Sequence, residues 1–203
     1  MADTSVAPVF DYGRIFRLSE RFARGTFRVH ALGELPGGSP HALTRGEIQP
    51  SEPVRFTHDE GSRIKDYIGT TWGALSLVSE RLISALDGFS GWQTYPVEVF
   101  DERGRLVVGY HGLAVTGRSG PIDNRLNPVE VLPPPVPQGK ASPHRIGLRF
   151  RPKAWDGSDV FCPGDTAFIF MTQDAKDALV TAKVTGIELD RITEIALPLA
   201  VRG

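Results

Sequence analysis

The feature that most constrains this chain is a segment that recurs near the C-terminus in degenerate form. The first copy reads LSLVSERLISAL and ends at Leu86, and the second reads FIFMTQDAKDAL and ends at Leu179. Aligning Ser79 with Thr172 gives the same offset as aligning the two leucines (172 − 79 = 93 and 179 − 86 = 93). A constant offset predicts that the two segments form the same local structure.

Each copy predicts a strand followed by a helix. Alternating apolar residues such as Leu75 and Leu77 indicate a strand with one buried face. Ser79 and Thr172 are good N-cap residues, and acids follow both of them where a helix N-terminus favours negative charge. The apolar helix positions are Val78, Leu82, Ala85, Leu86 and Phe89 in the first copy and Ala175, Ala178, Leu179 and Ala182 in the second.

Beyond each helix, a glycine (Gly88 or Gly186) can adopt the left-handed C-cap conformation, and a further strand follows. Aligning Val97 with Ile192 needs an offset of 95, so the second copy has a longer turn between helix and strand. Neither unit could bury its apolar face alone. We therefore expect an α+β fold with a mixed, mostly antiparallel sheet and two duplicated strand–helix–strand units. Chance recurrence of such units is the alternative.

The strongest boundary in the chain is the proline-rich stretch NPVEVLPPPVPQGKASPH at residues 127–144. Proline cannot donate to a sheet ladder and holds the backbone extended. The stretch is an excursion between two halves of one domain, an interdomain linker, or a ligand for a proline-recognising module. The part beyond it is only about 60 residues long and would be marginally stable alone, which favours the first interpretation.

The predicted organisation is one α+β domain at residues 61–203, preceded by a segment of uncertain structure at residues 1–60 that belongs to the same domain. Residues 1–9 are expected to be a loose tail. Residues 95–100 and 106–110 flank the turn-forming sequence DERG and predict a hairpin. The C-terminal sequence LPLAVRG predicts an edge strand.

Charge and composition argue against several classes of protein. The chain has 23 basic and 24 acidic side chains among 203 residues, a net charge of −1, which argues against a nucleic-acid binder with a broad basic surface. One cysteine, Cys162, excludes an internal disulfide framework. The sequence has no signal-peptide run and no apolar segment of membrane-spanning length. We expect no membrane association and a reducing, cytoplasmic location.

Strong catalytic signatures are absent from the sequence: there is no phosphate-binding glycine loop, dinucleotide fingerprint, zinc-protease helix motif or nucleophile elbow. Cys162 with His111 or His144 could form a nucleophile and base. A lone cysteine beside Phe161 is more often a small hydrophobic residue of the core. We expect no catalytic residue, cofactor or metal.

Four motifs, in this order and spacing, resemble a known family. They are KDYIGTTWGALSLVSERLISALDGFSGWQTYPVEV, the pair Ile122–Asp123, WDGSDVF and TGIEL. Together they are similar to the myxobacterial-type immunity-protein family of bacterial polymorphic toxin systems, formerly a domain of unknown function. The resemblance covers Ile64 to Ile195. The chain departs from the pattern at Lys65–Asp66–Tyr67, where the family has proline, aspartate and an aromatic residue, and at Thr172–Gln173, where serine and glutamate are commoner.

The resemblance implies a protein without enzymatic activity that binds and neutralises a cognate toxin, which protects the producing cell and its kin in interbacterial competition. The motif residues are mostly apolar and periodic, so they indicate the fold rather than the toxin-binding surface. We predict toxin contacts in two loops. The predicted contact residues are Trp155, Asp156, Asp159, Asp101, Glu102 and Arg103.

Two other functions compete with immunity. The first is a small-molecule-binding or hydrolytic enzyme with a site between the two repeat halves, where Cys162, His144 and Asp159 would act. The second is a scaffold that recruits partners through the run at residues 133–137.

Overall fold

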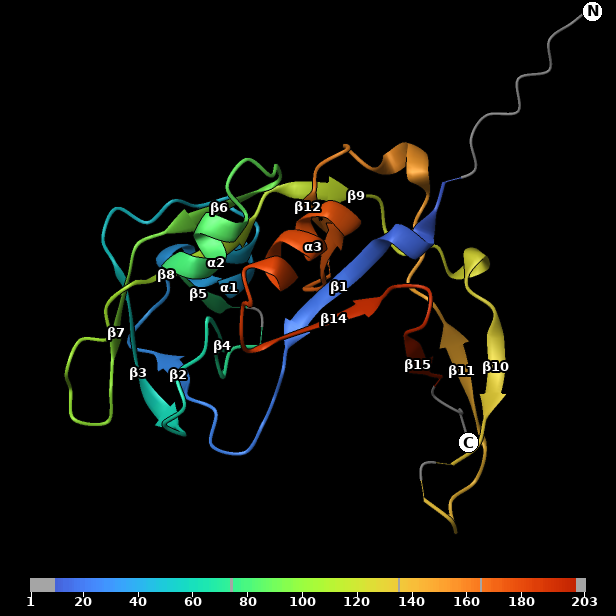
Figure 1. Ribbon diagram of the computed structural model, residues 1–203, viewed down its shortest axis with the longest axis horizontal. Coiled ribbons are helices and arrows are strands. Elements are labelled where there is room, and N and C mark those ends of the chain that lie inside the picture. Colours follow the sequence, from blue (N-terminus) through green and yellow to red (C-terminus); the bar gives the residue numbers. More distant parts are fainter. Residues whose placement is uncertain (1–9, 74, 135, 165, 200–203) are drawn as a thin grey trace, which may run out of the picture.

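The computed structural model describes residues 10–73, 75–134, 136–164 and 166–199, and they form an α+β fold (Figure 1). The predicted tail at residues 1–9 lies outside the described residues. The helices are α1 (Pro40–Thr44), α2 (Glu80–Ala85) and α3 (Gln173–Thr181). A five-stranded sheet has the order β14 (Ile187–Arg191), β1 (Ile15–Glu20), β13 (Ile169–Thr172), β12 (Val160–Pro163) and β9 (Gly117–Ser119). A four-stranded sheet has the order β4 (Tyr67–Gly69), β5 (Ser76–Ser79), β8 (Tyr110–Val115) and β6 (Trp92–Tyr95).

Two three-stranded sheets complete the described part of the fold. One has the order β2 (Arg28–Ala31), β3 (Val54–Glu60) and β7 (Val97–Phe100). The other has the order β10 (Val129–Leu132), β11 (Ser142–Ile146) and β15 (Ala196–Pro198). The β3–β7 and β9–β12 pairs are parallel and the other strand pairs are antiparallel, so the sheets are mixed.

The two larger sheets share one strand order. The order β14-β1-β13-β12 corresponds to β6-β8-β5-β4, with α3 following β13 as α2 follows β5. We name β4, β5, α2, β6 and β8 the first unit, and β12, β13, α3, β14 and β1 the second unit. The units differ in where their central neighbouring strand lies in the sequence. In the first unit, β8 pairs with β5 and follows α2, whereas in the second unit β1 pairs with β13 and comes from the N-terminal segment. Residues 15–20 therefore complete the second unit.

The pairing register also corresponds. Tyr67 pairs with Val78 in the first unit, and residues 93 positions later, Val160 and Met171, pair in the second (160 − 67 = 93 and 171 − 78 = 93). The strands after the helices correspond with an offset of 95, because the pair 92↔115 corresponds to 187↔20 (187 − 92 = 95), whereas β1 lies 95 positions before β8 (115 − 20 = 95). The two units thus match in order and register, while their common origin by duplication stays a prediction.

A carboxylate joins the N-cap of the first helix to the second unit. Ser79 Oγ accepts a hydrogen bond from Leu82 N at 3.4 Å and donates one to Asp66 Oδ1 at 2.8 Å. The other oxygen of Asp66 accepts from Thr185 N at 2.8 Å and from Thr185 Oγ1 at 2.7 Å. Because Thr185 follows α3, Asp66 joins the N-terminus of α2 to the segment after α3.

Asp159 makes the reciprocal connection. Thr172 Oγ1 accepts from Ala175 N at 3.5 Å and donates to Asp159 Oδ1 at 3.3 Å. Asp159 Oδ2 accepts from Ser90 N at 2.9 Å and from Ser90 Oγ at 2.8 Å, and Ser90 follows α2. The two units are therefore joined by crossed carboxylates, which we name the Asp66 latch and the Asp159 latch.

The residues after the helices differ from the expectation in one respect. Gly88 has a φ of 84°, as predicted for the end of the first helix. After α3 the left-handed residue is Lys183, with a φ of 55°, rather than Gly186 alone. Gly186 corresponds to Gly91, and a Cβ at either position would lie within 2.7 Å of a backbone oxygen of the other unit. These two glycines permit the close approach that the latches require.

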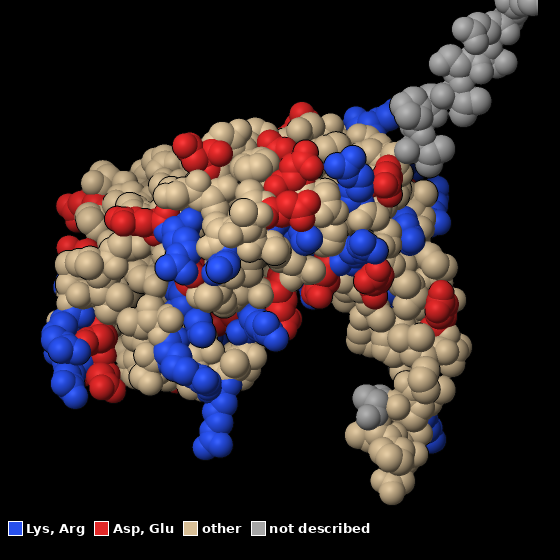
Figure 2. All heavy atoms as spheres, viewed as in Figure 1, with Lys and Arg blue, Asp and Glu red and all other residues tan. Residues whose placement is uncertain are grey.

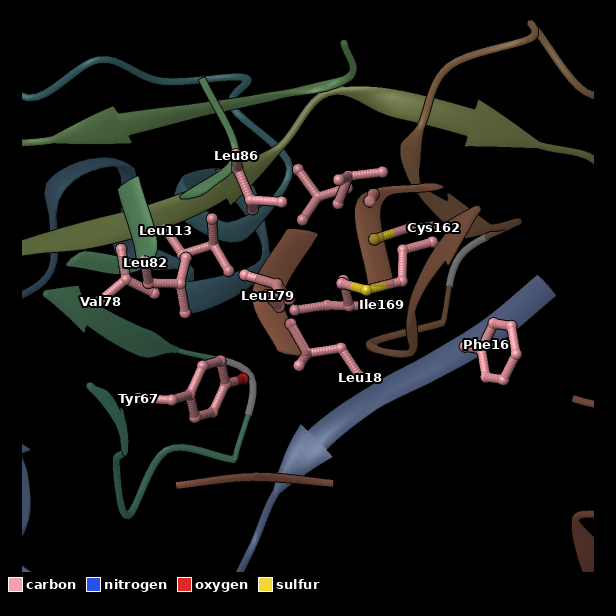
Figure 3. Close-up of a cluster of buried hydrophobic side chains, with 14 residues drawn as sticks. Phe16, Leu18, Tyr67, Val78, Leu82, Leu86, Leu113, Cys162, Ile169 and Leu179 are labelled. Carbon is pink, nitrogen blue, oxygen red and sulfur yellow. The ribbon is translucent and has the colours of Figure 1, made fainter. Parts of the chain in front are cut away.

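The two helices meet in a common hydrophobic core (Figure 3). Leu82 and Leu86 from α2 pack in one cluster with Leu179 from α3, and all three are buried. Leu113 from β8 and Ile169 from β13 belong to the same cluster. The apolar helix faces predicted from periodicity therefore face each other across the junction of the units.

The proline-rich stretch is folded as part of an arm. β10 and β11 pair antiparallel, and β15 joins the free edge of β11, so the predicted C-terminal edge strand is present in the described residues 196–198. The arm projects from the body (Figure 1), and the space-filling view shows a deep notch between arm and body (Figure 2). Pro133, Pro134 and Pro137 lie in the connection between β10 and β11, where no ladder donor is required.

The predicted hairpin between residues 95–100 and 106–110 is present next to its turn, and β7 has a second partner in β3 that the sequence did not predict. Asp101 N donates to Arg105 O at 2.9 Å and Val107 N donates to Val99 O at 2.7 Å, while Phe100 and Leu106 form an antiparallel bridge. Residues 106–109 form no described strand, and β8 pairs with β5 and β6. Local turn chemistry fixes the turn, whereas the strand partners depend on distant residues.

The Asp66 latch predicts a specific loss of stability. Asp66→Asn removes a charged acceptor of three hydrogen bonds, and we expect the free energy of unfolding at neutral pH to fall by about 2–3 kcal/mol. Asp177→Asn is the matched control, because Asp177 is an exposed α3 carboxylate bound by Gln173 and Lys176. The control should leave stability nearly unchanged, because surface substitutions of this kind have small effects. Urea unfolding of both variants measures the difference.

The loss of stability caused by Asp66→Asn should become smaller as the pH falls. Burial alone would raise the pKa of Asp66, but hydrogen bonds from Thr185 and Ser79 and the nearby Arg81 lower it overall. A lowered folded-state pKa contributes stability above the unfolded pKa that is lost as pH falls through the folded pKa. The difference between wild type and Asp66→Asn should thus shrink below about pH 4. An unchanged difference down to acid pH would contradict the latch.

Candidate functional site

The predicted contact residues occupy two separate places. Trp155 lies between η4 (Pro152–Ala154) and β12, where its Nε1 donates to Ser158 O at 3.1 Å. Its ring lies 5.6 Å from that of Phe10 and 5.3 Å from that of Phe161, measured between centroids. The side chain is thus packed against an aromatic cluster of the core.

The two acids that follow Trp155 also have internal partners. Asp156 accepts hydrogen bonds from Arg118 N at 2.7 Å and Ser158 N at 2.9 Å. Burial alone would raise the pKa of Asp156, but hydrogen bonds from Ser158 and Arg118 lower it overall. Asp159 forms the latch to Ser90 and Thr172. Both acids therefore hold the loop in place through internal hydrogen bonds, and only Asp156 is exposed.

The second predicted loop is the tight turn after β7. Asp101 accepts from Arg105 N and Arg103 N, each at 2.9 Å, and from Arg105 Nε at 2.8 Å. Hydrogen bonds from the backbone and side chain of Arg105 lower the pKa of Asp101 to about 2. Glu102 and Arg103 are exposed at the tip. Asp101 therefore shapes the turn, and its neighbours are free to contact a partner.

This turn lies beside two other loops. A shallow pocket of about 170 Å³ is lined by Asp101, Glu102 and Arg105 together with Phe27, His58 and Ile64. Residues 61–65 in turn lie against residues 21–25, since Gly25 O accepts from Ser62 N at 3.1 Å and Arg63 N at 3.0 Å. We name residues 21–25, 61–65 and 101–108 the three-loop surface.

The three-loop surface combines cations with large exposed apolar side chains. Phe22 is 66% exposed and Ile64 45% exposed. Arg21, Arg24 and Arg63 are exposed and form no ion pair within the described residues. Figure 2 shows basic side chains gathered over the lower part of the body, toward the loop between β1 and β2.

The sequence interpretation missed most of this surface. Basic and aromatic residues are mixed in the sequence RLSERFARGTFR, but no sequence pattern predicted that this stretch lies beside residues 61–65. The bridge between Thr26 and Arg63 brings the two stretches together across 37 positions (63 − 26 = 37). A contact of that separation has no local signature.

The residues of the enzyme alternative are dispersed. Cys162 is buried in the core beside both helices, and His144 lies on β11 in the arm, where its Nδ1 contacts Ser142 O at 2.9 Å. Asp159 is held in its latch, and no hydrogen bond or ion pair within the described ranges joins any two of these three. His111 lies on β8, opposite Val78. In the described part of the chain, no group of three or more histidine, cysteine or acidic residues could hold a metal ion.

Comparisons with known proteins add no assignment: no protein-family model matches the chain, and no curated protein matches it. Among the described residues, none of the helices has the length and apolar character needed to cross a membrane.

Burial predicts that Cys162 is unreactive. Its side chain is 1% exposed, and burial raises the pKa of the thiol to about 11, so almost no thiolate is present near neutral pH. We expect a thiol reagent at pH 8 to label the denatured protein fully and the native protein only at the rate of global unfolding. Rapid labelling of the folded protein would show instead that Cys162 is an accessible thiol.

Proposed function

We propose that this chain is an immunity protein that binds and neutralises a cognate bacterial toxin in the cytoplasm of the producing cell, and that the three-loop surface makes the contact. The resemblance of residues 64–195 to immunity proteins supports the function. The observation that carries the choice of surface is the exposed Phe22 between Arg21 and Arg24, two arginines that form no ion pair with any described residue.

These residue types are the ones that dominate protein–protein interfaces. Aromatic and arginine side chains are enriched at interface hot spots, where a rigid ring fills a pocket and the guanidinium binds carboxylates. Phe22 and Ile64 would be the apolar anchors. Leu106 and Val108, which are 54% and 76% exposed, extend the apolar area. A specific complex buries about 1,600 Å² in total, so further segments beside these loops contribute to the contact.

The charges define the complementary partner. Arg21, Arg24 and Arg63 have no carboxylate of their own within the described residues, so a partner that supplies acidic side chains gains charge-assisted hydrogen bonds. Such a charge pattern also accelerates association. The toxin is therefore expected to present an acidic, partly apolar surface.

Charge reversal tests the surface. The binding partner to use is the protein encoded by the adjacent reading frame, with its affinity for the purified chain measured by calorimetry. R21E/R24E should weaken binding by at least about tenfold, because two attractive contacts become repulsive. K140E/K153E is the matched control, since both lysines are exposed on other segments, and it should bind within about threefold of wild type.

The outcomes separate the function from its surface. Equal loss of affinity in both double variants, or in neither, would contradict the three-loop surface while leaving a toxin complex intact. Absence of any complex with wild type, when the adjacent protein is toxic alone, would contradict the immunity function itself.

A further inference from the structure

The arm has a strand edge that no described strand covers. In the order β10-β11-β15, β10 (Val129–Leu132) pairs with β11 alone, and Figure 1 shows it on the side of the arm that faces away from the body. Val129 is 53% exposed and Val131 is 69% exposed. None of these residues belongs to the three-loop surface, and the proposed function makes no use of this edge.

The pairing register shows which backbone groups of β10 point to the free edge. Ile146 N donates to Pro128 O at 2.8 Å, so the even-numbered residues of β10 are the ones that bond to β11. Val131 lies opposite Pro143, which has no N–H group to donate. The N–H and C=O groups of Val129 and Val131 therefore point away from β11. Apart from the β10–β11 ladder, neither valine takes part in a backbone hydrogen bond with a described residue.

The other edge of the arm is protected by a proline, whereas the β10 edge is not. In β15 the odd-numbered residues bond to β11, since Gly147 N donates to Ile195 O at 2.8 Å, and Pro198 therefore faces the free edge. A proline in that position cannot donate to a further strand. On β10 both outward-facing residues keep their N–H groups, and Pro133 after the strand ends the row. The β10 edge thus offers two donors and two acceptors to an added strand.

The charge at the centre of this edge is Glu130. Its side chain is exposed, and its carboxylate forms no ion pair with a described residue. The residue opposite it on β11 is His144, whose Nδ1 contacts Ser142 O at 2.9 Å. Opposite charges in facing positions of neighbouring strands stabilise the pairing. The carboxylate therefore favours a basic side chain on the strand that is added.

The same carboxylate disfavours a second copy of the chain at this edge. Two antiparallel β10 strands use all their outward groups only when Val129 of each copy lies opposite Val131 of the other. That register sets Glu130 directly opposite its own copy, in a pair that is not hydrogen-bonded and whose side chains are closest. Like charges in such a pair destabilise it. The edge is therefore better suited to a strand of different sequence.

We propose that the free edge of β10 binds an extended segment of another protein, in which a basic residue stands between two β-branched apolar residues. The segment adds antiparallel to β10. Its two apolar residues exchange backbone hydrogen bonds with Val129 and Val131 and pack beside their side chains, while its lysine or arginine lies opposite Glu130. Because the added ladder is short, the segment alone binds weakly. This surface does not rest on the immunity function.

An NMR titration of the full, isotopically labelled chain tests the edge directly. The probe is an end-capped peptide of sequence STVKVTS, added up to about 2 mM. We expect saturable shifts of the Val129 and Val131 amide signals and slower exchange of both amide protons with solvent. The same peptide with both valines N-methylated lacks the two donors and should bind at least about tenfold more weakly. Absence of shifts at these two residues, or equal binding of the methylated peptide, would overturn the proposal.

A charge exchange tests the role of Glu130. The peptide STVEVTS should bind the wild-type chain at least about fivefold more weakly than STVKVTS, and Glu130→Lys should reverse this preference. Glu188→Lys is the matched control, because Glu188 is an exposed acid on the edge strand β14, and it should leave the preference unchanged. An equal preference for STVKVTS in wild type and Glu130→Lys would overturn the proposed charge selection.

Sedimentation of the chain alone tests the competing occupant. We expect no self-association through β10. Val131→Pro removes one outward donor and leaves the bonds to β11 in place, because Val131 does not donate to that strand. A wild-type dimer that is lost in Val131→Pro would show that a second copy occupies the edge, and it would overturn the proposal.

Discussion

The fold depends on two carboxylates that each serve both units. Asp66 binds the N-cap of α2 and the segment after α3, and Asp159 binds the N-cap of α3 and the segment after α2. The N-cap residue of each helix therefore binds a carboxylate that is shared with the other unit. Leu82 and Leu86 of α2 also pack with Leu179 of α3 in one buried cluster. Division at the proline-rich stretch would separate the partners of both latches and remove β1 from the second unit.

The sequence predicted those parts of the fold that have a local cause. Ser79 and Thr172 are N-caps because a hydroxyl can accept from the third residue of the helix, and that requirement is visible in the sequence. The apolar helix faces follow from the 3.6-residue period. An acid that binds a serine 69 positions away has no such signature (159 − 90 = 69). For the same reason β1 could not be assigned to the second unit, and the pairing of β7 with β3 could not be predicted.

The candidate binding surfaces also depend on contacts between distant residues that the sequence could not predict. Asp101 and Asp159 were predicted to contact the toxin, but Asp101 binds Arg103 and Arg105 within its own turn, and Asp159 binds Ser90 and Thr172. The near-neutral net charge of the whole chain does not reveal a local separation of charge: among the described residues, arginines without an ion pair gather on the three-loop surface, while most acids have internal partners. Net charge describes the whole chain, whereas a binding surface depends on which charges remain unpaired where the chain folds together.

Immunity can be tested by the growth of cells that express the protein of the adjacent reading frame. We expect this protein to arrest growth when expressed alone and co-expression of the wild-type chain to restore growth, while the R21E/R24E chain, present at the same level, does not. Arrest that persists with the wild-type chain, although the chain is folded and abundant, would contradict the assignment of immunity.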